Sequence, residues 1–238
     1  MNSNSLNAAD LMEWLPQLLQ TNDSFFPSGT FAHSFGLEGL VHLGHVGDQA
    51  DFGNFISEQV VPALEHFELP FVRLAHDAAR NSAVAKLVVL DERYGAMKGS
   101  SELREASRRI GSQRLQMLAR LRPHPLLAQL EAEQTARQFQ AHGAIIFGAQ
   151  TALDNTPVEA ALLGYYYQTL AGLVSAALKL IRIGQVAGQL LLSEHLRQAS
   201  KVMARSQRIR EADIGWFQPV LDIASMRHET AYSRIFIS

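Results

Sequence analysis

The stretch that decides the fold is residues 156–183, TPVEAALLGYYYQTLAGLVSAALKLIRI. It begins with the pattern of a capping box, in which Thr156 caps a helix, Pro157 takes the first position and Glu159 completes the box. Residues 160–178 carry no charge, so the segment is almost long enough to span a bilayer. Its polar and small residues make it only weakly hydrophobic. It therefore predicts the central helix of an all-α core, with a membrane span as the alternative.

The chain on both sides of this segment follows the same helical periodicity. Asp48 is a predicted cap of a helix that carries apolar residues from 52 to 60, and Pro62 is expected to separate it from the next one. Residues 144–147 and 234–237 could instead be strands. We expect an all-α fold, a single-domain bundle of about eight to ten helices over residues 1–238. Further helices are predicted at 11–19, 37–41, 71–78, 83–97, 101–121 and 190–203.

The composition restricts the class of protein. The 238 residues are 47% hydrophobic and 18% charged, which is enough for a buried core. A net charge of −2 gives no general attraction to nucleic acid or anionic lipid. Cysteine is absent, which excludes disulfides and thiolate chemistry and suits a reducing compartment. The first residues lack a basic segment before an apolar one, so no signal peptide is expected and we predict a cytoplasmic protein.

Residues 23–41, DSFFPSGTFAHSFGLEGLV, suggest either a catalytic loop or a binding loop. The segment 32–36 is similar to a nucleophile elbow, which would make Ser34 the nucleophile of a serine hydrolase. Such an elbow needs a strand before the serine, and Pro27 and Gly29 interrupt the preceding residues. The alternation of strands and helices typical of hydrolases is also missing. Helix capping or loop hydrogen bonding is the favoured role of Ser34, and catalysis stays as an alternative.

The sequence offers one weak metal site and no nucleotide site. Glu38, His42 and His45 have the i, i+4, i+7 spacing that places side chains on one helical face, but Gly44 interrupts the set. No Glu is followed by a His three residues later, and no H-E-x-x-H occurs. Phosphate-binding glycine motifs are absent as well. We expect no catalytic residue, no bound metal and no cofactor.

The C-terminal residues 222–238, DIASMRHETAYSRIFIS, combine aromatic, Met and Arg side chains. This composition is enriched in protein interfaces. A terminal helix docked on the core would look similar, so the residues themselves leave both readings open.

Five sets of motifs occur along the chain: Asp23-Ser24 with Phe26-Pro27 and Gly29, Phe31 to Ser34 with Gly36 to Glu38, Glu102 to Arg104 with Gly111, Gly184-Gln185 with Gly188-Gln189, and His228-Glu229 with Tyr232 to Arg234 and Ser238. In this order and spacing they resemble the motifs of the UreF family of urease accessory proteins, from about residue 11 to 238. Two positions depart from the family pattern, because Ser28 replaces an apolar residue and Thr30 a glycine or other small residue. We expect the turn itself to survive, since Pro27 and Gly29 remain.

The resemblance implies an all-α, dimeric, non-enzymatic protein that joins a UreD-like accessory protein and the GTPase UreG to deliver nickel to apo-urease. It implies a UreD interface at residues 226–238. From the net charge and the weakly hydrophobic central segment, we expect no binding of nucleic acid or membrane. Direct nickel binding through His42 and His45 remains an alternative beside the hydrolase. The residues expected to contact partners are Phe31, His33, Ser34, Glu38, His228, Glu229, Tyr232, Ser233 and Arg234.

Overall fold

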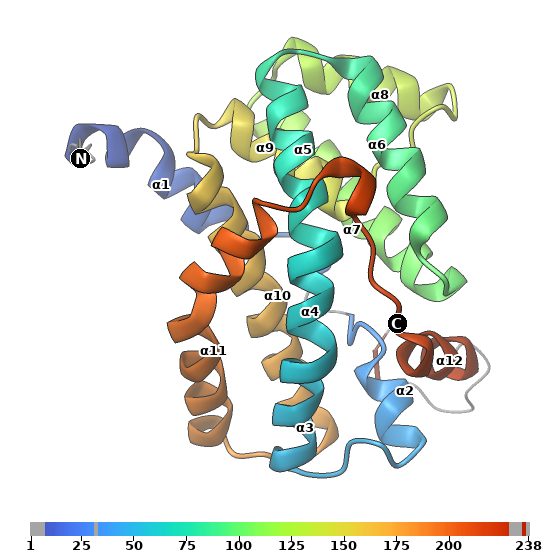
Figure 1. The fold of residues 1–238 in the computed structure, drawn as a ribbon. Helices are drawn as coiled ribbons and strands as arrows, with labels where there is room; N and C mark the ends of the chain where they lie inside the picture. Colours follow the sequence, from blue (N-terminus) through green and yellow to red (C-terminus); the bar gives the residue numbers. More distant parts are fainter. Residues whose placement is uncertain (1–7, 31–32, 229–234, 237–238) are drawn as a thin grey trace.

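In a computed structural model, which describes residues 8–30, 33–228 and 235–236, every regular element is helical (Figure 1). The all-α prediction is therefore confirmed, and the described residues contain no strand. The elements are α1 (Ala8–Asn22), α2 (Leu37–His42), α3 (Gln49–Phe55), the π-helical turn η2 (Ile56–Val60), α4 (Val61–Ala63), the π-helical turn η3 (Leu64–Glu68), α5 (Leu69–Arg80), α6 (Val84–Met97), α7 (Ser101–Leu121), α8 (Pro125–Thr135), α9 (Gly143–Leu153), α10 (Val158–Leu180), α11 (Gln185–Ser206), the 3₁₀ turn η4 (Glu211–Asp213) and α12 (Pro219–His228).

The predicted central helix is α10, which packs against α11, α5, α9 and α1. Its predicted capping box is wrong. The helix begins after Pro157, with no capping bond from a side chain. The carbonyl oxygen of Thr156 instead accepts a hydrogen bond of 2.9 Å from Nε2 of the buried His76. The N–H of Thr156, which a capping box would pair with Glu159, donates to the carbonyl oxygen of Thr151 at 2.9 Å. Among the described residues, no helix is both long and apolar enough to cross a membrane.

The most deeply buried helix is α9, in which residues 144–152 are all buried. It packs mainly on α5 and α7 and also touches α10 and α6. The alternative of a strand at residues 144–147 is wrong, because a helix surrounded by other helices is apolar on every side and loses its amphipathic pattern. Residues 235–236 are likewise not in a strand.

One long helical column runs from α3 through η2, α4 and η3 to α5 (Figure 1). Asp48 caps it as predicted, with its Oδ1 accepting bonds from two backbone N–H groups. The predicted division at Pro62 is wrong, because π-helical turns precede Pro62 and Pro70 and the backbone stays right-handed helical between them. Pro70 has no N–H for the carbonyl oxygen of His66. That oxygen accepts a bond of 3.1 Å from the N–H of Gly215 instead.

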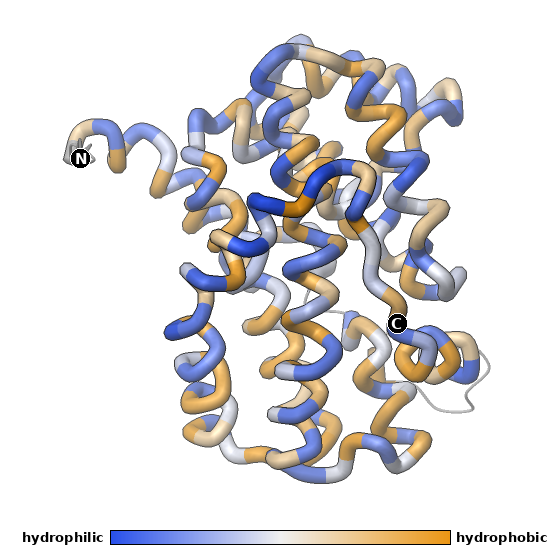
Figure 2. The backbone as a smooth tube through the Cα atoms, viewed as in Figure 1, coloured by the Kyte–Doolittle hydropathy of each residue, from blue (hydrophilic) through white to orange (hydrophobic). Residues whose placement is uncertain are grey.

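Hydrophobic and hydrophilic residues alternate along most of the helices, as Figure 2 shows, and the apolar faces meet in one buried cluster. This cluster contains side chains from α1 at one end of the chain to α12 at the other. Near its edge α12 packs on α2 and also touches α7. The two stretches that the sequence singled out, 23–41 and the C-terminal segment, therefore lie together. The single-domain prediction for residues 1–238 includes residues outside the described ranges and stays a prediction.

Candidate functional site

The first part of the loop, residues 23–30, is fixed by its own hydrogen bonds. Asp23 Oδ1 accepts a bond of 2.7 Å from the N–H of Phe25, whose side chain is 92% exposed. Phe26 is buried beneath the guanidinium of Arg114. Ser28 and Thr30 are also buried, and their hydroxyl oxygens lie 2.9 Å apart in a hydrogen bond. The two departures from the family pattern are thus partners of each other, which explains how this loop accommodates both.

The second part of the loop is buried where the sequence suggested a partner surface. His33 and Ser34 are 2% and 1% exposed. Burial, with a smaller effect of Arg109, lowers the pKa of His33 to about 4, so it is neutral at physiological pH. Ser34 Oγ accepts a bond of 3.3 Å from the N–H of Glu38, in the first turn of α2. This is the loop hydrogen bonding that the sequence favoured for Ser34.

Glu38 lies at the centre of a junction between α2 and the C-terminus. It is 1% exposed, and its two carboxylate oxygens accept bonds of 2.7 and 2.9 Å from the N–H groups of Ile235 and Phe236. Its Oε2 also lies 3.1 Å from Nε2 of His228. The other ring nitrogen of His228, Nδ1, is 2.8 Å from Oε1 of Glu102 on α7. We call these five residues the C-terminal junction.

The backbones of α2 and α12 approach each other closely, which brings the end of α12 to this junction. A Cβ on Gly39 would lie 2.6 Å from the carbonyl oxygen of Ala224, so only glycine lets α12 come this near to α2. The side of α12 that faces α2 is buried and includes Leu221, Ser225 and His228. The helix is therefore held by packing along its length and by the C-terminal junction at its end.

The structure brings His33, Ser34, Glu38 and His228 into one buried region. It does not leave them on a surface, so their predicted contact with a partner stays a prediction, and in this conformation they support neighbouring surfaces instead. The remaining predicted residues, Phe31, Glu229, Tyr232, Ser233 and Arg234, lie outside the described residues.

The exposed part of this region is the outer face of α12, which the sequence indicated only in part, through the interface-like composition of residues 222–238. Val220, Ile223 and Met226 are 50%, 51% and 47% exposed and recur every three residues, so they form one apolar stripe along the helix. Phe217, just before the helix, is 81% exposed. The stripe was visible in the sequence as a periodicity, but which face of the helix is buried depends on its packing against α2.

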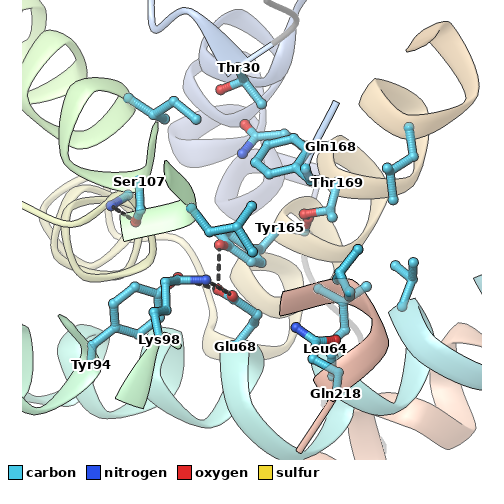
Figure 3. A pocket seen from close by; sticks show the side chains of 18 of the residues that line it. Thr30, Leu64, Glu68, Tyr94, Lys98, Ser107, Tyr165, Gln168, Thr169 and Gln218 are labelled. Atoms are coloured by element: carbon cyan, nitrogen blue, oxygen red, sulfur yellow. Dashed lines mark hydrogen bonds and ion pairs between the residues drawn. The ribbon is translucent and has the colours of Figure 1, made fainter. Parts of the chain in front are cut away.

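A cavity of about 110 Å³ lies beside the junction, between η3, α6, α7, α10 and the start of α12 (Figure 3). At its wall, the Glu68 carboxylate accepts bonds of 2.6 Å from Tyr94, 2.8 Å from Tyr165 and 2.8 Å from Lys98. Burial and this carboxylate raise the pKa of both tyrosines well above its usual range, so they remain donors. The three donors come from two parts of the chain, the C-terminal end of α6 and α10, so the cluster links several helices. Because all three already donate to Glu68, its carboxylate is not available as a catalytic base.

A second buried polar cluster surrounds Arg114, which is 1% exposed. Its guanidinium donates to Oε1 of Gln150 at 2.6 Å, Oε1 of Gln168 at 2.8 Å and the carbonyl oxygen of Thr21 at 3.1 Å. Burial lowers its pKa to about 10, which still leaves it charged. Sequence reasoning missed this residue because its partners are up to 93 positions away.

This geometry gives little support to the two alternative functions, a serine hydrolase and a nickel-binding protein. Ser34 follows no strand in the part of the chain that the structure describes, and its hydroxyl is buried, so the nucleophile elbow is missing. The helix α2 ends at His42, and Gly44 then turns the chain with a left-handed φ of 75°, which separates His45 from the helical face. Among the described residues, no three His, Asp or Glu side chains are arranged to hold a metal ion.

Comparison with known proteins agrees with the motifs. The family model described as UreF matches residues 46–196. Urease accessory protein UreF of Azoarcus sp. (strain BH72) is 32% identical over 234 residues, covering 98% of this chain and all of that protein. The UreF proteins of Bacillus sp. (strain TB-90) and Actinobacillus pleuropneumoniae are 31% and 29% identical, each over 95% of this chain and their own full length. This chain therefore belongs to the UreF family of urease accessory proteins.

Proposed function

We propose that this protein is a non-catalytic, cytoplasmic scaffold for urease maturation. It holds a UreD-like accessory protein and a UreG-like GTPase against apo-urease, so that GTP hydrolysis is coupled to nickel insertion. Membership of the UreF family supports the accessory role. A scaffold acts through contacts, and this agrees with a fold whose buried polar groups bind one another.

The observation that carries the proposal is the apolar stripe of α12. Three apolar side chains, each about half exposed, lie side by side on a helix whose opposite face is fully packed. Exposed apolar side chains that are grouped in this way mark interaction surfaces more often than isolated ones do. Two residues of the stripe, Ile223 and Met226, lie within residues 222–238, whose composition is typical of interfaces. We therefore assign the UreD-like partner to the outer face of α12 and the residues that follow it.

The buried residues of the C-terminal junction have a supporting role in this proposal. Glu38 and His228 fix the end of α12 against α2 and so determine where the stripe lies. Phe31, His33 and Ser34 precede α2 in the chain and would affect the same surface through it. Glu229, Tyr232, Ser233 and Arg234 follow α12 directly and are proposed to extend the interface.

The test is a pull-down of the UreD-like partner by full-length chain carrying Ile223→Asp. When the UreD-like protein binds, a carboxylate at the centre of the stripe would be buried without a cation or hydrogen-bond donor to pair with it. We therefore expect the affinity to fall by roughly tenfold or more. The matched control is Val89→Asp, which places the same charge at a similarly exposed apolar position on α6. Circular dichroism checks that both variants fold.

Two results would contradict the assignment. One is unchanged binding by a folded Ile223→Asp variant, and the other is an equal loss in the Val89→Asp control. Coexpression with the UreD-like protein, the UreG-like GTPase and apo-urease then tests the function, with nickel content and urease activity measured with and without this chain. Light scattering of the purified protein tests the proposed homodimer.

A further inference from the structure

A basic trough lies along α7, away from the stripe of α12. Its cavity of about 490 Å³ is bounded by α7 on one side and by residues 134–140, at the end of α8, on the other. Three arginines line it, Arg108, Arg109 and Arg137, together with a single carboxylate, that of Glu105. Nothing in the proposed scaffold function uses this trough.

The α7 wall is built by helical spacing. Glu105, Arg108, Arg109 and Ser112 occupy positions i, i+3, i+4 and i+7, so their side chains project from the same face. Oε1 of Glu105 lies 3.1 Å from Nε of Arg109, and its Oε2 lies 3.6 Å from Nη1 of Arg108. One carboxylate thus holds two guanidinium groups at the cavity and neutralises only part of their charge.

The opposite wall contributes a cation without a carboxylate. Arg137 follows α8 with a left-handed φ of 60°, which is unfavourable for a side chain of this kind. Among the described residues it forms no ion pair, although it lines the same cavity as Arg108 and Arg109. Three guanidinium groups therefore share one carboxylate here, which leaves an excess of positive charge.

Both walls are fixed in position. A Cβ on Gly111 would lie 1.9 Å from the carbonyl oxygen of Ala141, so α7 and the second wall touch through their backbones. Ser112 Oγ accepts a bond of 2.7 Å from Nε2 of Gln134 across the trough. Asp91 Oδ2 accepts a bond of 2.6 Å from the N–H of Gln140. A site held open in this way loses little conformational entropy when a ligand binds.

A second cavity, of about 590 Å³, adjoins the first and shares Arg108, Arg137 and Gln140 with it. It adds Arg104, whose guanidinium donates to the carbonyl oxygens of Lys98 and Gly99. Two carboxylates line it as well: Asp91, which already accepts bonds from backbone N–H groups, and the exposed Glu92. Arg108 and Arg137 therefore stand between two neighbouring cavities, which suits an anion with more than one charged group.

We propose that this trough binds a phosphate-bearing small anion. Guanidinium groups bind phosphate oxygens through pairs of parallel, charge-assisted hydrogen bonds, and the serine and glutamine side chains add neutral donors. The aromatic residue of the cavity, Phe139, is buried and offers no face for stacking a base. Recognition is therefore of the phosphate groups, whether they come from inorganic pyrophosphate or from a nucleotide.

The test is calorimetric titration of the full chain with inorganic pyrophosphate and, separately, with a nucleoside triphosphate. We expect Arg137→Gln to weaken binding of both about tenfold or more, because one charge-assisted hydrogen-bonding group is lost. The control is Arg120→Gln, which removes the same charge from an exposed position of α7 outside the cavity. We expect it to change the affinity less than about twofold, as for a screened surface charge. The anion that binds more tightly identifies the source of the phosphate.

Three outcomes would overturn the proposal. The first is no detectable binding of either anion, and the second is equal weakening by Arg137→Gln and Arg120→Gln, which would indicate only a general charge effect. The third is binding of a glutamate-rich peptide with no binding of pyrophosphate, which would assign the trough to an acidic protein surface. Partner pull-downs with the Arg137→Gln variant keep this result separate from the scaffold function, since we expect them to be unchanged.

Discussion

Replacing Glu38 by Gln is the sharpest test of the C-terminal junction. The carboxylate accepts two backbone N–H groups, at 2.7 Å from Ile235 and 2.9 Å from Phe236, and its Oε2 lies 3.1 Å from His228. Glutamine has nearly the same shape but keeps only one acceptor oxygen. Its NH₂ group would face a donor in place of the second oxygen. The change therefore removes one hydrogen bond and the negative charge, with little change in volume.

The expected cost follows from these contacts. A hydrogen bond to a charged group contributes about 1.5–3 kcal/mol, and a buried donor left unpaired adds to the loss. We therefore expect the docking of the C-terminal segment to weaken by about 2–4 kcal/mol. We expect a local loss, because Glu38 holds the C-terminal members of the buried cluster, such as Phe236, while most of the cluster comes from α1 to α11.

Hydrogen exchange measures this loss directly. We expect amide protection in α12 to fall by about 30-fold or more in Glu38→Gln, while protection in α5 and α9 changes little. Glu58→Gln, the same change at an exposed position on η2, serves as the control. The reasoning is refuted if protection in α12 is unchanged in Glu38→Gln, or if the control lowers it equally.

Three further predictions concern stability and are measured by urea unfolding. Ser28→Ala should cost about 1–2 kcal/mol by leaving the buried hydroxyl of Thr30 unpaired, and adding Thr30→Val should recover most of that loss; a double variant less stable than Ser28→Ala would contradict this pairing. Gly39→Ala should cost about 1–3 kcal/mol, because its Cβ would meet a backbone oxygen of α12, whereas Gly172→Ala inside α10, whose Cβ would lie no nearer than 4.0 Å to Phe35, should be neutral or stabilising; equal effects of the two would be inconsistent with the close approach. Burial lowers the pKa of His142 from 6.5 to about 3, so the unfolded chain takes up the proton more readily and stability falls as pH decreases below about 6.5. At pH 5 this group should cost about 2 kcal/mol relative to pH 8, and His142→Gln should lose less stability over that range; an unaltered pH dependence would argue against a neutral buried histidine.

The sequence predicted the helices better than the interruptions between them. The helix at 101–121 agrees residue for residue with α7, because its apolar spacing and its helix-forming residues point to the same structure. The prediction at Pro62 was wrong, since a π-helical turn let the helix continue past it. The capping box at Thr156 was wrong because the N–H of Thr156 already donates to the carbonyl oxygen of Thr151, in the turn that follows α9.

The candidate site was predicted in composition but not in arrangement. His33, Ser34 and Glu38 are polar, and polar residues in a loop are usually exposed. Their burial depends on partners from the other end of the chain, such as Phe236, 198 positions from Glu38. No local pattern encodes such a separation. The apolar stripe of α12 was equally hidden, because three apolar residues at helical spacing are as typical of a buried face as of an exposed one.

The hydrogen bonds that Glu38 accepts come from main-chain N–H groups, which every residue except proline possesses. The anchor consequently places few demands on the side chain at position 235, and Ile235 is indeed 66% exposed. Substitutions there can therefore change the exposed chemistry of this segment without loosening its attachment. Glu38 thus fixes the position of the backbone at residues 235 and 236, while the side chain at position 235 is free to vary.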